Sequence, residues 1–221
     1  MNLFELKEPI AYLAVVTTIL QFLSGILVCK QYVANRTTAE ASSFPFIAGV
    51  LSCGIWFLYG LTKRNDKIVM VNTVGLMLMI SYTTVFYIYT FKKSAVLRQC
   101  TFTFIFFLML LGYIYVEEDN ENLVIRLGSL ACSFTLITVA APMSKLWYVI
   151  RVKSTECLPF PMILMSLFVS VFWYMYGYID QDLFIAVPNF IGMILALAQL
   201  ALFIIFPSTS HSSIQYKSTI T

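Results

Sequence analysis

Long apolar runs separated by short polar segments dominate the chain. Seven of these runs are long enough for a helix to cross a bilayer, which needs roughly 17–25 residues. Their approximate bounds are Ile10–Cys29, Phe44–Leu61, Ile68–Phe91, Cys100–Val116, Leu127–Ser144, Leu158–Ile179 and Leu183–Phe206. None of the runs contains Asp, Glu, Lys, Arg or His. The pattern therefore predicts an all-α membrane protein with seven transmembrane helices.

Composition supports this prediction, and charge sets the orientation. The chain is 60% hydrophobic and 11% charged, whereas about a quarter of the residues in a soluble domain are charged. If the N-terminus lies outside, nine of the 14 Lys and Arg residues fall in cytoplasmic segments, as the positive-inside rule requires. We therefore expect the N-terminus outside and the C-terminus in the cytoplasm. The net charge of +3 follows from this asymmetry and does not indicate a nucleic-acid partner.

A motif within residues 56–75 returns 117 residues later. It reads W-x-x-Y-G, eleven residues, then N-x-x-G. The two copies consist of Trp56, Tyr59, Gly60, Asn72 and Gly75, and of Trp173, Tyr176, Gly177, Asn189 and Gly192. Such an internal repeat predicts a protein built from two copies of one unit.

The repeat groups the predicted helices as three, one and three. A unit of three helices ends on the side opposite to where it begins, so two parallel units need one more crossing between them. We assign residues 1–94 to a first three-helix bundle, 95–120 to a linker helix and 121–207 to a second bundle. Residues 208–221, rich in Ser and Thr, are expected to form a disordered cytoplasmic tail.

The Asn and Trp residues of the repeat are the candidate binding residues. A lone Asn in a membrane helix more often makes an interhelical hydrogen bond, and a lone Trp more often anchors at the interface. Here Asn72 and Asn189 are symmetric, as are Trp56 and Trp173, so both carboxamides can face one ligand. An indole adds a flat apolar face and one N–H donor. This combination suits a neutral polyhydroxylated solute such as a sugar better than an ion.

The lack of ionisable residues in the predicted spans bears on the mechanism. Carriers driven by protons or sodium usually need such residues within the membrane, so downhill facilitated passage is the simplest interpretation. The sequence shows no nucleophile–base pair and no metal-ligand cluster, and its five cysteines form no C-x-x-C motif. We therefore expect a protein that is not an enzyme and that needs no cofactor or metal.

Prolines indicate where the helices are expected to bend. Pro45, Pro142 and Pro159 lie within or at the ends of spans, where proline permits a kink. We interpret them as hinges near the cytoplasmic side. Pro188 is expected to bend the helix that carries Asn189, whereas the equivalent residue of the first copy, Val71, is not.

Tyr-Gly pairs indicate a gate at the other side. Tyr59-Gly60 and Tyr176-Gly177 lie near the outer ends of their spans. A tyrosine next to a glycine suits an outer gate, and Asp182, close to the same end, is a candidate hydrogen-bond partner for it.

These residues resemble the SWEET sugar transporters, the MtN3/saliva family, and in particular its animal members. The resemblance covers roughly residues 10–207. The segments that carry it are Ser42–Phe46, Trp56–Gly60, Val71–Gly75, Lys153–Cys157 and Trp173–Gly177. It implies two parallel three-helix bundles joined by a linker helix, and passive, bidirectional transport of mono- or disaccharides, above all glucose-like hexoses. We also expect a homo-oligomer, dimeric or trimeric, in the plasma membrane, with the Golgi as a second location.

The resemblance also assigns roles to single residues. It implies a pocket formed by Trp56, Asn72, Trp173 and Asn189, with Ser52 and Val169 one turn earlier affecting substrate size. It implies an inner hinge of four prolines, but Gly25 stands where the first is expected, which leaves Pro45, Pro142 and Pro159. Glycine also permits bending. We therefore expect the hinge to be retained, with Gly25 contributing to the bending to a different degree than a proline would. Gly128 matches a glycine that the family needs for helix packing.

Two other classes of membrane protein fit the sequence less well. A retinal protein needs a lysine in its last helix, which Leu183–Phe206 lacks, and a seven-helix receptor does not usually carry a 3+3 repeat. A PQ-loop amino-acid exporter carries Pro-Gln at the start of the pocket helix and often an acid within the membrane. Here the dipeptide is Pro45-Phe46, and the predicted spans hold no acid.

Overall fold

The structure, a computed structural model, describes residues 3–156 and 158–206, and in this part of the chain all regular elements are helical. A short 3-10 helix, η1 (Leu3–Leu6), precedes the α-helices. These are α1 (Lys7–Leu23), α2 (Gly25–Asn35), α3 (Phe44–Lys63), α4 (Asp66–Tyr89), α5 (Lys93–Val116), α6 (Asn120–Val152), α7 (Phe160–Ile179) and α8 (Leu183–Ile205). The predicted tail, residues 208–221, lies outside the described residues.

The helices match the seven predicted spans one to one. Within the described residues, seven segments are long and apolar enough to cross a membrane, and α1 and α2 together form the first of them, Lys7–Asn35. Helices α5 and α6 begin at Lys93 and Asn120, earlier than the runs predicted from Cys100 and Leu127. A helix continues into the interfacial region, where polar residues are tolerated, so an apolar run marks less than its full length.

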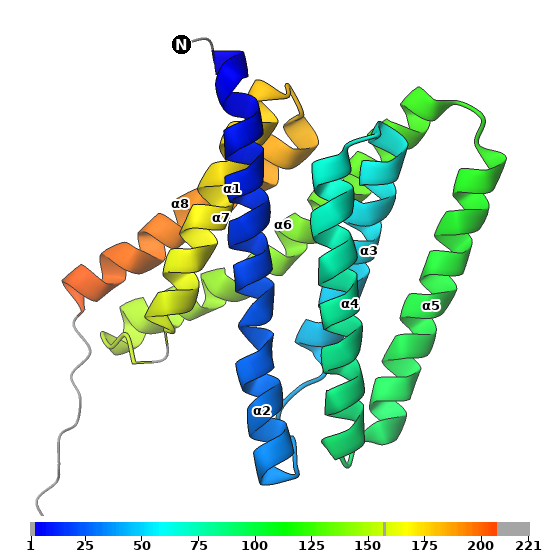
Figure 1. The fold of residues 1–221 in the computed structure, drawn as a ribbon. Helices are drawn as coiled ribbons and strands as arrows, with labels where there is room; N and C mark the ends of the chain where they lie inside the picture. The colour runs from blue at the N-terminus through cyan, green and yellow to red at the C-terminus, as the bar shows by residue number, and fades with distance from the viewer. Residues whose placement is uncertain (1–2, 157, 207–221) are drawn as a thin grey trace, which may run out of the picture.

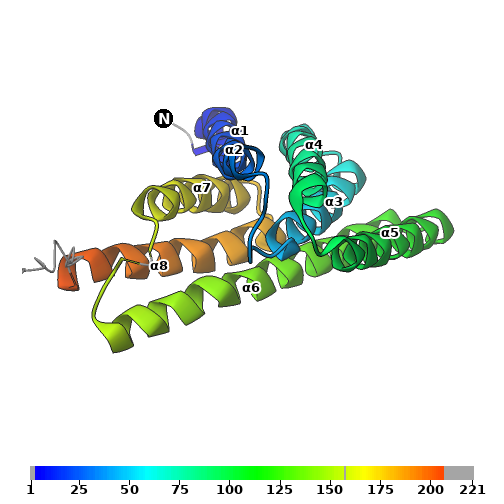
Figure 2. The same cartoon turned by 90° about the horizontal axis from the view of Figure 1, so that it is seen from below.

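Each half is a bundle in which one helix contacts the other two. In the first half α4 contacts α1 and α3, and in the second half α8 contacts α6 and α7. The halves meet where α1 lies against α7 and α3 against α6 (Figure 2). Helix α5 packs on α3, at the side of the molecule away from α7 and α8 (Figure 1). The structure therefore has the predicted class of fold, two parallel bundles and a linker helix.

The helices define two ends of the molecule. The upper end is the one where α1 begins, at the top of Figure 1, and the lower end is the one where α2 ends. Helices α4 and α8 begin at the upper end with equivalent caps. The Asn65 side chain accepts the N–H of Ile68 (3.2 Å), and the Asp182 side chain accepts the N–H groups of Phe184 (3.0 Å) and Ile185 (3.3 Å). Such side chains satisfy N–H groups that a helix start leaves free.

Among the described residues, the hydrophobic cluster that the halves share lies nearer the upper end than the two clusters that belong to one half each. One cluster joins Val15 and Tyr59 of the first half to Leu127, Trp173 and Ile185 of the second. Two smaller clusters of the described residues lie lower, one between α3, α4 and α5 and one between α6, α7 and α8. In Figure 1 the lower parts of α6, α7 and α8 lean away from α2 and α4. The halves are therefore closed together at the upper end and part toward the lower end.

Candidate functional site

A cavity of about 300 Å³ lies between the two halves. It is lined by all six predicted pocket residues, Trp56, Asn72, Trp173, Asn189, Ser52 and Val169. Helices α3 and α4 supply one set of these side chains, and α7 and α8 supply the other. Because the two bundles are parallel copies of one unit, residues 117 positions apart line the same cavity from its two sides.

The carboxamides of Asn72 and Asn189 are held in the same way. Each Nδ2 atom donates to the backbone carbonyl four residues earlier, Asn72 to Ile68 and Asn189 to Ile185, at 2.8 Å in both cases. This bond is within the helix, unlike the interhelical bond considered as the alternative role. It leaves the amide oxygen and the second N–H of each side chain without a partner among the described residues. These atoms are the polar groups that the cavity offers to a ligand.

The two indoles are hydrogen-bonded across the boundary between the halves. Trp56 Nε1 on α3 donates to Thr135 Oγ1 on α6 (3.1 Å), and Trp173 Nε1 on α7 donates to Thr18 Oγ1 on α1 (2.8 Å). The indole N–H, expected from the sequence to be a donor for the ligand, is therefore already used. Each tryptophan presents an apolar face to the cavity and no free donor.

The threonine hydroxyls have a fixed direction of donation. Thr18 donates to the carbonyl of Ala14 (2.7 Å) and Thr135 to that of Ala131 (2.9 Å), so each hydroxyl has only lone pairs left for the indole. Sequence reasoning missed both threonines. The signal was present, because Thr18 and Thr135 are 117 residues apart, the offset that also relates Trp56 to Trp173.

Hydrogen bonds between the halves also close the upper end. Tyr59 Oη donates to Asp182 Oδ2 at 2.7 Å, the contact expected of Asp182, and the role of this pair as a gate stays a prediction. Tyr176 Oη accepts from Asn65 Nδ2 at 2.7 Å. Asn65 and Asp182 are equivalent by the repeat, so each half supplies a tyrosine and the polar cap that binds the tyrosine of the other half. Gly60 and Gly177 lie beside these tyrosines in the sequence.

The glycines of the Tyr-Gly pairs allow close helix packing at the upper end. A Cβ atom on Gly177 would lie 2.8 Å from the backbone nitrogen of Ala186 on α8, and one on Gly60 would lie 3.0 Å from the side chain of Ile68 on α4. Both positions therefore admit little more than a hydrogen atom. Gly128 has the same role between α6 and α8, where a Cβ would overlap the ring of Phe184.

An ion-pair network surrounds this upper closure. Lys63 pairs with Asp182, whose side chain is only 1% exposed, and with Asp180 at 3.0 Å. Lys7 at the start of α1 pairs with the other oxygen of Asp180 at 2.6 Å. Burial works to raise the pKa of Asp180, but the hydrogen bonds from Lys7 and Lys63 outweigh it and hold this pKa below its usual range. Lys7, Lys63 and Asp180 were not predicted, although Lys63 and Asp180 are also 117 residues apart.

The predicted hinge at Gly25 coincides with the break between α1 and α2. A Cβ on Gly25 would overlap the ring of Tyr82, and Tyr82 Oη donates to the carbonyl of Phe22 at 3.0 Å. Ser24 makes short-range bonds to the Gln21 carbonyl instead of continuing the α-helical pattern. A side chain inserted at the break thus satisfies a carbonyl, a cause of helix interruption that needs no proline.

The prolines lie at different places in their helices. Pro45 is in the first turn of α3, and Pro159 precedes α7 as its cap. Pro188 is buried inside α8, directly before Asn189. Pro142 falls within the bounds of α6, but its side chain lies outside the described residues. Bending at these positions stays a prediction.

Comparison with known proteins points to one family. The model of the family described as "Sugar efflux transporter for intercellular exchange" matches residues 8–94 and 125–211, two ranges that are themselves 117 residues apart. The Drosophila pseudoobscura pseudoobscura protein "Sugar transporter SWEET1" is 38% identical to the chain, with 95% of the chain and 94% of that protein covered. The Arabidopsis thaliana "Bidirectional sugar transporter SWEET7" is 30% identical over 82% of the chain and 73% of that protein. A solved structure of a eukaryotic SWEET transporter matches with a TM-score of 0.80 at 22% identity, covering 91% of the chain and 98% of that structure.

Proposed function

Because the chain belongs to this family of sugar efflux transporters, the MtN3/saliva or SWEET family, we propose that it moves sugars passively and in both directions by alternating access. Its substrates are monosaccharides or disaccharides, and above all glucose-like hexoses. Seven apolar helical segments among the described residues, with α1 and α2 forming one of them, place the protein in a membrane as a multi-pass protein.

The symmetric cavity is the observation that carries this proposal. Two indole faces can pack against the C–H faces of a pyranose, and the two carboxamides can exchange hydrogen bonds with its hydroxyl groups. A volume of about 300 Å³ is at the low end of the range for small-molecule pockets, which is roughly 300–1,000 Å³. This size favours a single hexose ring over a disaccharide in the state that the structure represents.

The arrangement of the two ends supports alternating access. Tyr59, Asp182 and Lys63 link the halves above the cavity. Below it the hydrophobic clusters of the two halves are separate among the described residues, and a side-chain hydrogen bond from Gln21 on α1 to Ser166 on α7 (2.8 Å) joins the halves there. A sugar enters from the lower end in this state. Transport requires the upper contacts to break and the lower parts of the halves to come together around the same cavity.

The cavity lining supports passive transport. Among the described residues that line it, none is charged, so its wall offers no carboxylate, imidazole or amine that could relay a proton or bind a sodium ion. A sugar therefore moves down its own gradient.

The orientation, oligomeric state and location complete the proposal. We place the upper end outside and the basic lower end in the cytoplasm, following the distribution of Lys and Arg. The structure then represents a state open toward the cytoplasm. We propose that the protein works as a dimer or trimer in the plasma membrane, with the Golgi as a second location.

Tracer uptake tests the proposal. Cells that express the protein should equilibrate labelled glucose across the membrane, with the same final level whether or not a pH gradient is present. Asn72→Ala and Asn189→Ala should each abolish uptake at unchanged surface expression. Gly112→Ala on α5 is the matched control, because a Cβ there would meet no atom within 4 Å. Accumulation above the external concentration, or normal uptake by both Asn variants, would contradict the proposal.

A further inference from the structure

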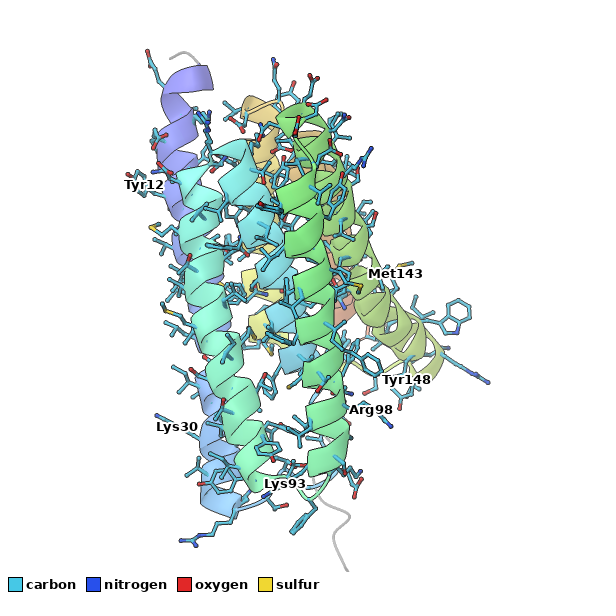
Figure 3. All side chains as sticks on the ribbon, turned by 90° about the vertical axis from the view of Figure 1, so that its right-hand side faces the viewer. Tyr12, Lys30, Lys93, Arg98, Met143 and Tyr148 are labelled. Atoms are coloured by element: carbon cyan, nitrogen blue, oxygen red, sulfur yellow. The ribbon has the colours of Figure 1, made fainter. Side chains whose placement is uncertain are left out.

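A larger apolar groove lies outside the central cavity, between α3, α4 and α5. Its volume is about 540 Å³, and its walls include Gly54 and Phe57 of α3, Leu76 and Ile80 of α4, and Phe104 and Leu111 of α5. It exists because α5 packs mainly on α3, with the ring of Phe107 seated where a Cβ on Gly54 would lie. Figure 3 shows α4 and α5 side by side on this face, with α3 behind and between them.

Two of the three threonines that line the groove direct their hydroxyls to their own helix. Thr83 donates its hydroxyl to the carbonyl of Met79 (2.8 Å), and Thr84 donates to that of Ile80 (2.9 Å). Hydroxyls that are bonded to their own helix have no proton left for a ligand in the groove. A groove of this kind at membrane depth suits a hydrocarbon chain, because water needs several polar partners to occupy such a space.

A group of basic residues lies at the lower mouth of the groove. Lys92 and Lys93 are exposed at the start of α5, and Lys93 is visible at this end in Figure 3, whereas the exposed Arg98 lies on the opposite side of α5 from the groove. Lys93 precedes the groove residue Cys100 by seven residues, or two helical turns, so it lies on the same face of α5 and roughly 10 Å lower. Of the three, only Lys92 has an ion-pair partner among the described residues, the exposed Glu40 at 3.0 Å. The mouth therefore has an excess of positive charge at the level of the lipid headgroups.

We propose that this groove is a binding site for an anionic phospholipid. One acyl chain lies between α4 and α5, and the phosphate lies at Lys93, with Lys92 adding to the positive field. Basic residues at the end of a membrane helix favour acidic headgroups in this way. The site belongs to the first half alone, because the linker helix α5 has no equivalent in the second half.

The charge of the lower end argues against a second copy of the chain as the occupant. In the described residues this end carries Lys30, Arg36, Lys92, Lys93, Arg98, Arg151 and Lys153, against the two acids Glu40 and Glu156. A copy inserted in the same orientation would bring the same positive excess to the mouth of the groove. An anionic headgroup neutralises that excess, whereas a neighbouring copy adds to it.

Native mass spectrometry of the full chain in neutral detergent tests this site without any transport assay. The probes are dioleoyl phosphatidylglycerol, dioleoyl phosphatidylcholine and glycerol 3-phosphate, which lacks acyl chains. One phosphatidylglycerol should bind per chain, more tightly than phosphatidylcholine, and glycerol 3-phosphate should not compete. Lys93→Gln should weaken phosphatidylglycerol binding about fivefold, and Arg151→Gln, which removes one charge from the lower end of α6, should not.

Ile80→Trp tests the groove itself. Ile80 is 53% exposed, so an indole at this position fills the groove without disturbing the core. It should abolish tight binding of phosphatidylglycerol. The proposal is overturned if the two phospholipids bind alike, if glycerol 3-phosphate competes, or if Lys93→Gln and Arg151→Gln have equal effects. It is also overturned if Ile80→Trp leaves lipid binding intact and instead separates an oligomer, which would make the groove an interface between copies.

Discussion

The two halves agree around the central cavity and differ in charge at the upper end. Around the cavity, each Trp, Asn and Thr makes the same hydrogen bond as its equivalent 117 residues away. At the upper end Lys63 is the equivalent of Asp180, and Asn65 is the equivalent of Asp182. Identical charged residues at such positions would face each other as like charges across the pseudo-symmetry axis. An attractive ion pair across this axis requires the two copies to differ, whereas a cavity that contacts one ligand from both sides does not.

The upper closure should respond most strongly to a change that makes the halves alike. Lys63→Asp places an acid at the equivalent of Asp180 and leaves Asp182 buried without its lysine. Breaking a buried pair in this way costs about 3 kcal/mol, or more than a hundredfold in the population of the closed upper end. Spin labels at the upper ends of α1 and α7 should move apart, and uptake should fall at least tenfold.

A charge swap and a matched substitution control this experiment. Lys63→Asp combined with Asp180→Lys restores opposite charges across the axis and should recover part of the closure. Lys67→Asp makes the same chemical change at the upper end, but the partner of Lys67 is the exposed Glu8, and it should have a much smaller effect. An unchanged label distance in Lys63→Asp would show that the ion pairs do not hold this end.

The crossed indole–threonine bonds should respond equally in the two halves. Thr18→Val and Thr135→Val each leave a Trp N–H without its acceptor and release the indole from the orientation that faces the cavity. Loss of such a bond costs about 1–3 kcal/mol, so we expect the KM for sugar to rise about tenfold in either variant. Thr18→Ser and Thr135→Ser keep the hydroxyl and should behave like the unmodified protein. Intrinsic tryptophan fluorescence reports the released indole independently of transport.

Unequal results would sharpen the comparison. If Thr18→Val raises the KM and Thr135→Val does not, the sugar is held mainly by the Trp173 side of the cavity. If the serine variants are as impaired as the valine variants, the methyl group packs the indole and the hydrogen bond is not what positions it.

The sequence predicted the cavity better than the closure for a physical reason. Duplication preserves residue types, so Trp56, Asn72 and their equivalents were recognisable by identity at one spacing. Lys63 and Asp180 occupy equivalent positions with opposite charges, and a search for identical residues passes over them. A hinge was expected at Gly25 but not a break in the helix there. Tyr82, which bonds the Phe22 carbonyl at this break, lies 60 residues from Phe22 on α4, and local patterns do not show such contacts.

The hinge at Gly25 should show a smaller effect. Tyr82→Phe keeps the ring that packs on Gly25 but removes the hydroxyl that bonds the Phe22 carbonyl. The part-buried carbonyl then lacks this partner, at a cost of about 1 kcal/mol. We expect a slightly lower melting temperature and a modest fall in the rate of uptake. Cys29→Ser, a polar change on α2 near the same break, is the comparison. If Tyr82→Phe leaves transport and stability unchanged, the Tyr82–Phe22 bond does not contribute to the hinge.

The smallest expected effect is that of pH on the upper closure. The pKa of Asp180 lies below its usual range because Lys7 and Lys63 bond the charged carboxylate. A carboxyl with a lowered pKa keeps its charge above that value, so its pairing is lost only as the pH falls through the acid range below about 4. Between pH 5 and pH 8 the label distance at the upper end should stay constant, and the rate of uptake should not follow the protonation of Asp180. Opening of the upper end between pH 7 and pH 5 would mean that burial outweighs the two lysines. The asymmetric pair would then be a pH-dependent gate, and the difference between the halves would regulate transport as well as stabilise one state.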